Sequence, residues 1–279
     1  MIVYGVLTYD DRYEVLSKTL SCLSDFETII CHNGCSQPCL TYSSNNIILN
    51  ENLGSSGGYG AIIRRFLSDY KCGDFLVLLD DDNCVDLEFH KNLMLNIDEG
   101  LEIGGSFRAS RAKSKSIYHK KSYRYFEEDN YFGLNIFKRN SYDQGYLGVA
   151  PYGGLAISHE ILSVIGLPDK KYFVYGDDIE YTLRLKKIDR RIKFLEDCII
   201  YDQFSSTCSE DTSHRYFQGK ISKELLGYQL LNHKKVSYVT KSTYRFYVNK
   251  FLFLLIIIWK YSLSKSSFSQ LLFVFRRVL

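Results

Sequence analysis

Residues 75–82 read FLVLLDDD, five apolar residues followed directly by three aspartates. A continuous apolar run of this length is typical of a buried strand in a parallel sheet, and open α/β sheets bind ligands beyond the carboxyl ends of such strands. Along an extended chain, Asp80 and Asp82 point to one side and Asp81 to the other. Three adjacent carboxylates repel one another unless a cation is present, and hard divalent cations take oxygen ligands. The stretch therefore predicts a divalent-metal site after this strand, with a solvated acidic turn as the alternative.

The residues before this stretch alternate between strand-like and helix-like patterns. Three further apolar segments predict strands at residues 2–8, 26–31 and 47–49. Apolar residues at helical spacing predict helices at residues 16–23 and 58–70. Together with the strand at residues 75–79, this order predicts an α/β fold with an open, mostly parallel sheet flanked by helices.

A glycine-rich stretch, NLGSSGGYG at residues 52–60, precedes the second of these helices. Glycines allow close backbone approach, and a helix N-terminus favours anions. The stretch matches neither the dinucleotide-binding nor the P-loop glycine pattern. It predicts a loop that cradles an anion, with an ordinary tight turn as an equal alternative.

A second acidic cluster, YGDDIE at residues 175–180, opens a further predicted helix. The helix N-terminus stabilises the ionised form of Asp177 and Asp178, and Glu180 is spaced to pair with Arg184 one turn later. An aspartate placed there is suited to accept a proton from a hydroxyl nucleophile. N-capping alone is the alternative.

Composition places the chain among globular proteins. Its 279 residues are 46% hydrophobic and 24% charged, which excludes wholesale disorder, a collagen-like fibre and a polytopic membrane protein. The balance of 35 basic and 32 acidic residues argues against a dedicated nucleic-acid binder. The 23 tyrosines and 18 phenylalanines fit a large core or a site that stacks sugars or bases.

The eight cysteines form no Cys-x-x-Cys pair. Cys31, Cys35 and Cys39 recur around His32, but this spacing matches no common zinc module. The chain begins MIVY, without a basic segment or a cleavage site, so no signal peptide is predicted. Reduced thiols in the cytoplasm are therefore expected.

The C-terminal residues 216–279 are predicted to form a helical extension of a catalytic domain at residues 1–215. Nine consecutive apolar residues occupy positions 251–259, too few to span a bilayer, and lysines and arginines flank them. A basic and apolar helical tail suits the surface of an anionic membrane. Packing on the catalytic domain, or on a second copy in a homo-oligomer, is the alternative.

The order of these motifs resembles the family 2 glycosyltransferases with the GT-A fold, especially the branch of rhamnosyl- and galactofuranosyltransferases. The resemblance covers roughly residues 1–230 and rests on several segments together. These are residues 8–12, 33–36, 52–60, 80–82, 152–154, 173–184 and 201–205.

The resemblance implies a role for each candidate residue. Asp178 is expected to be the general base, with Asp177 and Glu180 ordering the acceptor. Mn²⁺ or Mg²⁺ is expected on Asp80 and Asp82. The nucleotide-sugar contacts are expected from Thr8, Tyr9, Asp10, Arg12, His32, Asn33, Asn52, Gly57, Gly58, Asp80, Asp81, Gly153 and Gly154.

Two positions depart from the family pattern. His32 stands where members often carry an aspartate that contacts the base. Where members often supply a metal-binding histidine after the last strand, this chain has Asp202, with His214 twelve residues later. Asp202 is the favoured third metal ligand.

The resemblance implies a metal-dependent, inverting transfer of a sugar from a nucleotide diphosphate, UDP or dTDP first, to a hydroxyl of a glycan or lipid-linked acceptor. Bacterial surface-polysaccharide synthesis, such as O-antigen or capsule, at the inner face of the plasma membrane is the expected setting. A nucleotidyltransferase and a non-catalytic glycan-binding scaffold are the alternatives.

Overall fold

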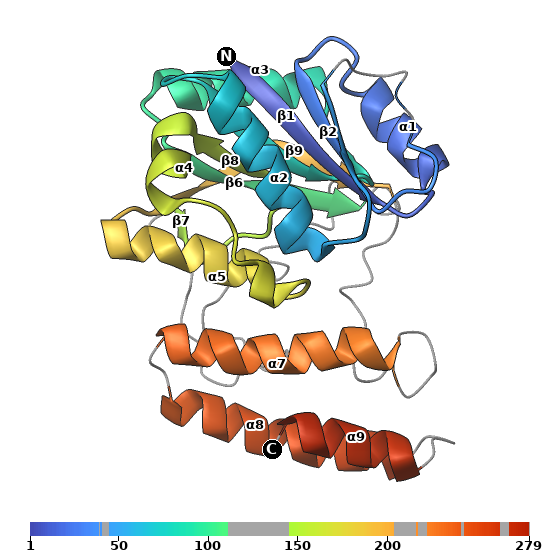
Figure 1. The fold of residues 1–279 in the computed structure, drawn as a ribbon. Coiled ribbons are helices and arrows are strands. Elements are labelled where there is room, and N and C mark those ends of the chain that lie inside the picture. The colour runs from blue at the N-terminus through green and yellow to red at the C-terminus, as the bar shows by residue number, and fades with distance from the viewer. Residues whose placement is uncertain are drawn as a thin grey trace.

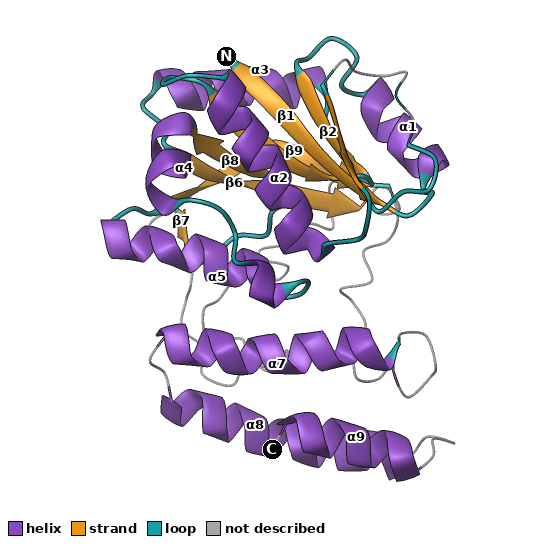
Figure 2. Cartoon of the chain, viewed as in Figure 1, coloured by secondary structure: helices purple, strands orange, loops and turns teal. Residues whose placement is uncertain are grey.

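The computed structural model describes residues 1–38, 40, 45–110, 145–203, 216, 222–240, 243–262 and 268–278. A central sheet is covered by helices on both faces, and three further helices lie beyond one of these helical layers (Figures 1 and 2). The expected α/β class with a helical C-terminal end is confirmed.

The sheet has nine strands in the order β3-β2-β1-β4-β8-β6-β9-β5, and β7 pairs with β9. Strands β1 to β4 form a parallel block, whereas β8 runs antiparallel between β4 and β6. The strands are β1 Ile2–Tyr9, β2 Thr28–Asn33, β3 Asn46–Leu49, β4 Phe75–Asp80, β5 Asn83–Cys84, β6 Ile103–Ser110, β7 Tyr146–Leu147, β8 Leu155–Ser158 and β9 Ile192–Asp202.

Short helices connect and cover these strands. They are α1 Tyr13–Ser21, α2 Gly54–Asp69, α3 Leu87–Asp98, α4 His159–Ile165 and α5 Asp177–Leu183, with 3₁₀ turns at Lys170–Tyr172 and Arg184–Ile188. Helix α2 begins at Gly54, not near residue 58, so the prediction of a glycine-rich loop up to residue 60 is wrong. The glycines are compatible with the helix because they pack closely there.

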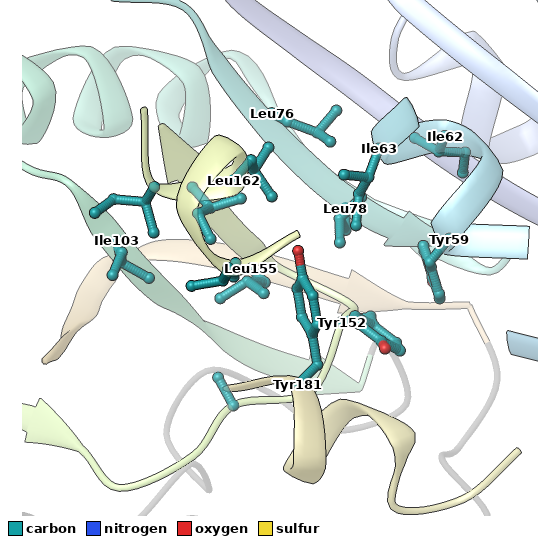
Figure 3. Packing of buried hydrophobic residues seen from close by; sticks show 14 of the residues in the cluster. Tyr59, Ile62, Ile63, Leu76, Leu78, Ile103, Tyr152, Leu155, Leu162 and Tyr181 are labelled. Atoms are coloured by element: carbon teal, nitrogen blue, oxygen red, sulfur yellow. The ribbon is translucent and has the colours of Figure 1, made fainter. Parts of the chain in front are cut away.

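Strand β4 shows why its apolar run is continuous. Leu76 and Leu78 pack in the core under α2, α4 and α5, while Val77 and Leu79 pack in the core under α1 and α3. Both faces of the strand are buried, as expected for the centre of a doubly covered sheet. Figure 3 shows the first of these cores, in which Tyr59 and Tyr152 lie beside the aliphatic residues.

The C-terminal segment folds into α7 Lys223–Thr240, α8 Thr243–Ser262 and α9 Phe268–Val278. Helix α7 contacts α5, and α8 and α9 form the layer farthest from the sheet (Figure 1). A third core, which includes Leu226, Phe253 and Val274, joins the three helices. Among the helices that the structure describes, none is long and apolar enough to cross a membrane. The domain boundary at residue 215 stays a prediction.

Gly154 joins three strands at the centre of the sheet. Its N–H donates to the carbonyl of Leu78 at 2.7 Å, and its carbonyl accepts from the N–H of Ser106 at 3.0 Å. Its φ is +93°, and a Cβ atom there would lie 2.6 Å from Ile200 Cδ1 and 3.0 Å from Ser106 Cβ. Glycine is therefore required here for both conformation and space.

We expect Gly154→Ala to destabilise the protein more than Gly100→Ala. Gly100 has a similar φ of +91° but no atom within 4 Å of the added Cβ. Both variants lose about 1–2 kcal/mol through left-handed backbone strain, and Gly154→Ala loses about 1–3 kcal/mol more through overpacking. Urea denaturation measures both free energies of unfolding. Equal losses would show that the space around Gly154 is not limiting.

Candidate functional site

Polar side chains gather where the parallel strands end. The carboxyl ends of β1, β2 and β4 lie at one edge of the sheet because these strands run parallel, with Thr8 beside His32 and Leu7 beside Asp80 in the register. Strand β9 ends there as well, since Asp202 pairs with Asn83 just after β4. The residues at these strand ends that are expected to bind the nucleotide sugar are therefore brought together at this edge.

Asp81 is the buried member of the aspartate triplet, at 2% exposure. Its carboxylate accepts a hydrogen bond from Thr8 Oγ1 at 2.9 Å and forms an ion pair with Arg12 Nη1 at 2.8 Å. Its carbonyl accepts from Thr19 Oγ1 at 2.7 Å. Burial raises the pKa of Asp81 to about 7, and the charge of Arg12 and the Thr8 hydrogen bond oppose that rise. Both carboxylate oxygens are engaged within the chain, so Asp81 positions the loop after β1; its predicted contact with a nucleotide stays a prediction.

Asp80 and Asp82 have different surroundings from Asp81. The hydroxyl of Tyr59 donates to Asp80 Oδ1 at 2.6 Å. The Asn83 amide donates to Asp202 Oδ1 at 2.9 Å and to Asp82 Oδ1 at 3.3 Å. The buried amide of Asn83 thus binds both carboxylates and holds Asp82 and Asp202 near each other.

These carboxylates are the candidate ligands for a metal ion. Within the described part of the chain, no three His, Cys, Asp or Glu side chains are grouped to hold a metal. His214, the alternative ligand, lies outside the described residues. Mg²⁺ is often bound through one or two carboxylates together with substrate phosphates. The pair Asp82 and Asp202 fits such a partial site, to which a diphosphate would add oxygen ligands.

Asn33 fastens the end of β2 to the start of α2. Its Nδ2 donates to the Asn52 side chain at 3.1 Å and to the carbonyl of Gly54 at 3.0 Å, and its Oδ1 accepts from the N–H of Leu53 at 2.8 Å. Asn33 is buried. The amides of Asn33 and Asn52 therefore shape the loop before α2.

Gly57 and Gly58 lie in the first turns of α2. A Cβ at Gly58 would lie 2.3 Å from Leu7 Cδ1, and one at Gly57 would lie 2.4 Å from Leu53 Cβ. Gly58 lets the helix approach β1 closely, and Gly57 leaves room for the side chain of Leu53. Whether they also contact a nucleotide sugar stays a prediction.

His32 is fully buried near the end of β2. Its Nε2 lies 3.0 Å from Asn46 Oδ1, and its Nδ1 has no hydrogen-bond partner among the described residues. Burial lowers the pKa of His32, although the Asn46 contact opposes this shift, so the imidazole is neutral at physiological pH. Cys31 is buried beside it and Cys39 lies outside the described residues, so the zinc interpretation gains no support.

The loop after β1 is exposed. Tyr9 is half exposed, and the guanidinium of Arg12 lies 5.2 Å from its ring centroid. Asp10 has a positive φ of 55°, and its carbonyl accepts from Cys35 Sγ. Tyr9 and Arg12 thus present an aromatic face and a cation next to the edge of the sheet.

The second acidic cluster begins α5. Asp177 is buried, and Ser55 Oγ donates to its Oδ2 at 2.6 Å. Burial, followed by the charge of Asp178, raises the pKa of Asp177, while the Ser55 hydrogen bond lowers it. Asp178 is only partly buried, and its Oδ1 accepts from the N–H of Ile179 at 2.8 Å. Asp178 is therefore the carboxylate of the two that a substrate can reach.

Glu180 is occupied by Arg184. Arg184 Nε and Nη2 donate to the two Glu180 oxygens at 2.8 and 2.7 Å, which is a bidentate pair. Arg184 Nη1 also donates to the carbonyl of Leu167 at 2.7 Å. The expected i,i+4 pair is confirmed, and it fastens α5 to the segment after α4.

The backbone before Asp177 is strained. Phe173, Tyr175 and Gly176 have φ values of 54°, 63° and 84°. The N–H of Ser56 donates to the carbonyl of Phe173 at 3.2 Å, from the start of α2. Asn232 of α7 donates to the carbonyls of Tyr172, Val174 and Tyr175 at 2.6, 2.9 and 2.8 Å. Strain of this kind clusters at functional sites and persists only where neighbouring contacts enforce it.

Two tyrosines connect the acidic clusters. Tyr59, which donates to Asp80, lies 4.4 Å from Tyr152 between ring centroids, and both are in the core of Figure 3. The Tyr152 hydroxyl is buried with no partner found in the described chain. Burial and the charges of Asp177 and Asp178 raise the pKa of Tyr152. Gly153 and Gly154 follow Tyr152 directly, and their expected contact with a nucleotide sugar stays a prediction.

Sequence reasoning missed several polar residues that position the site. They are Thr19, Ser55, Tyr59, Asn83, Gln203 and Asn232. Four of them had a local signal: Asn83 directly follows the aspartate triplet, Ser55 and Tyr59 lie in the glycine-rich stretch, and Gln203 follows Asp202.

No protein-family model matches the chain, and comparison with curated protein sequences found no match either. Solved structures do match. TarS of S. aureus gives a TM-score of 0.52 at 12% identity, over 83% of this chain and 43% of TarS. GalNAc-T7, solved with UDP, GalNAc and Mn²⁺, gives 0.58 at 10% identity, over 86% of this chain and 48% of that protein. Both are glycosyltransferases with GT-A-like folds, and the chain spans less than half of each. The chain therefore has a GT-A-like fold.

We expect Asp177→Asn to change how stability depends on pH. A carboxyl group whose pKa is raised by folding stabilises the protein most at low pH, and this contribution is lost as the pH rises from about 4 toward neutral. The asparagine of the variant cannot ionise, so the variant does not lose this stability as the pH rises. One pKa unit corresponds to about 1.4 kcal/mol, so the free energy of unfolding of the variant relative to wild type should rise by more than about 1 kcal/mol between pH 4.5 and pH 7.5.

Urea denaturation at both pH values makes the measurement. Asp98→Asn, which removes an exposed carboxylate at the end of α3, controls for the loss of one charge. A difference between Asp177→Asn and wild type that does not vary with pH would contradict the raised pKa.

Proposed function

We propose that the protein is a metal-dependent, inverting glycosyltransferase that moves a sugar from a nucleotide diphosphate to a hydroxyl of a glycan or lipid-linked acceptor. The observation that carries the proposal is the pair of acidic clusters, one at the strand edge with Asp82 and Asp202 and one at the start of α5 with Asp178. The first cluster suits the binding of the nucleotide-diphosphate donor, and the second suits activation of the acceptor hydroxyl. The GT-A-like fold of the chain, shared with two glycosyltransferases, supports the same class.

The donor is assigned to the strand edge. The base and ribose would lie against the loops after β1 and β2, near Tyr9, Arg12 and His32. Asp82 and Asp202 would hold Mn²⁺ or Mg²⁺, and the cation would offset the negative charge that builds on the leaving diphosphate. GalNAc-T7 was solved with UDP and Mn²⁺, which supports this assignment.

The acceptor is assigned to α5. Asp178 takes the proton of the acceptor hydroxyl while that oxygen forms its bond to the anomeric carbon. The bond from the anomeric carbon to the diphosphate oxygen breaks at the opposite face, so one displacement inverts the configuration. Asp177, held by Ser55, fixes the start of the helix and keeps Asp178 in place. The Glu180–Arg184 pair fastens the other side of that helix.

The biological setting proposed is synthesis of bacterial surface polysaccharide, such as O-antigen or capsule, at the inner face of the plasma membrane. UDP and dTDP sugars are the first donors to test. The tyrosine-rich composition suits a carbohydrate acceptor.

We expect Asp178→Asn and Asp82→Ala to fail in different ways. Removing a general base costs about 10²–10⁴-fold in rate, so Asp178→Asn should transfer sugar at least about a hundredfold more slowly while binding donor normally. Asp82→Ala should bind the donor more weakly, and added Mn²⁺ should no longer strengthen binding. Calorimetric titration of the nucleotide and a transfer assay separate the two effects. Equal donor affinity of Asp82→Ala and wild type would remove Asp82 from the proposed metal site.

A thermal-shift screen tests the proposal as a whole. UDP, dTDP, GDP and CDP are each added with Mn²⁺ and with chelator to protein shown to be folded. A nucleotide at a hundred times its dissociation constant stabilises the protein by about 2.7 kcal/mol, which is readily visible as a raised midpoint. A shift with one nucleotide that requires the metal would identify the donor class. No shift with any nucleotide would contradict a nucleotide-sugar transferase.

A further inference from the structure

Helix α8 carries apolar side chains on two opposite sides, and within the described part of the chain only one of these sides is buried. Asn249, Phe253 and Ile257 recur every fourth residue and are buried. The opposite side exposes an aromatic and aliphatic stripe, with Trp259 at 63% and Phe251 at 62% exposure. The stripe consists of Tyr244, Tyr247, Phe251, Leu255, Ile258 and Trp259. Their spacing of three or four residues places them on one side of an α-helix.

The neighbouring helix α9 adds Phe268 and Leu272, which are also exposed and lie one turn apart. Both helices belong to the layer farthest from the sheet (Figure 1). The six exposed apolar side chains along one side of α8 mark an interaction site, since monomeric soluble proteins rarely expose large contiguous apolar patches.

The charge of this part of the chain is one-sided. Residues 225–279 contain nine lysines and arginines and no aspartate or glutamate. The whole chain has 35 basic and 32 acidic residues, so the remainder is net acidic. Lys250 and Lys260 adjoin the exposed stripe, and the Lys250 ammonium lies 5.9 Å from the Tyr247 ring centroid. An aromatic and basic helix surface matches the interface of an anionic bilayer, where Trp and Tyr are enriched and each nearby basic residue strengthens binding about fivefold.

We infer that the exposed stripe of α8, with Phe268 and Leu272 of α9, docks onto the surface of an anionic lipid bilayer. A second copy of the chain is disfavoured, because pairing this surface with itself would bring together two segments that carry only positive side-chain charge after residue 224. A bilayer with acidic headgroups buries the apolar side chains and attracts the positively charged ones.

Trp259 is the only tryptophan of the chain, so its fluorescence reports on the stripe directly. The full-length protein is titrated with vesicles of phosphatidylcholine alone and with vesicles that also contain phosphatidylglycerol. We expect a blue shift of the emission with the anionic vesicles, quenching by lipids brominated on their acyl chains, and weaker binding at high salt.

A matched pair of variants keeps the test specific. Phe251→Gln, Leu255→Gln and Ile258→Gln together retain Trp259, and we expect them to weaken vesicle binding at least about tenfold. The control replaces Leu87, Leu95 and Val164, which are at least as exposed as Leu255 and Ile258 but lie on α3 and α4, by glutamine and should bind like wild type. Circular dichroism checks that both variants fold.

Three results would overturn the inference. One is unchanged emission with every vesicle, and another is equal binding by the stripe variant and wild type. The third is emission that depends on protein concentration without lipid, together with a doubled mass in light scattering, which would assign the stripe to a second copy. The readout does not depend on nucleotide binding, so failure here and failure of the proposed transferase function are separate outcomes.

Discussion

The buried carboxylate of Asp81 organises the strand edge on which the candidate donor site is built. It binds Thr8 at the end of β1 and Arg12 just before α1, while its carbonyl binds Thr19 within α1. Asp81 and Asp82 form the turn after β4, so the extended geometry expected for the triplet ends at Asp80. The Asn83 side chain closes this turn by accepting from the N–H of Asp80 at 2.9 Å. The least accessible aspartate of the triplet therefore helps to anchor the turn that carries Asp82 beside Asp80.

The other half of the site depends on a strained backbone held from two directions. Residues in sparsely populated φ regions cost about 1–3 kcal/mol each, and Phe173 and Tyr175 both adopt such conformations before Asp177. The start of α2 and Asn232 of α7 supply the hydrogen bonds that hold this segment. Helix α7, although it follows the sheet in sequence, is thus part of the support of the candidate catalytic residue.

The sequence predicted the elements whose signals are local. The apolar runs of β1 and β4 and the polar start of α5 could be read from periodicity and from the placement of acidic residues at the ends of elements. The antiparallel direction of β8 could not, because a four-residue strand with three apolar residues carries no information about strand direction. Glycines at the start of α2 predicted a loop, whereas the structure has a helix there, in which close packing against Leu7 leaves no space for a side chain at Gly58.

In the candidate site, too, the sequence predicted the residues that have a local signal. Charged residues were found because three aspartates in a row are costly without a partner, but the amides of Asn83 and Asn232 were not. Each of them acts through partners that are close only after folding: Asp202, for instance, is 119 positions from Asn83. Such residues look like ordinary surface amides until the tertiary structure brings their partners to them.

The antiparallel position of β8 also affects how the chain is made. Strand β4 pairs with β1 on one side, and its partner on the other side is β8, from Phe75 opposite Ser158 to Leu78 opposite Leu155. During synthesis the ribosome completes β4 at Asp80 well before it reaches Leu155, the first residue of β8, so the edge of β4 that pairs with β8 lacks this partner in the meantime. Open edges of this kind are templates for aggregation. The order of the strands along the chain thus makes the nascent protein most vulnerable just when the first half of its sheet is complete.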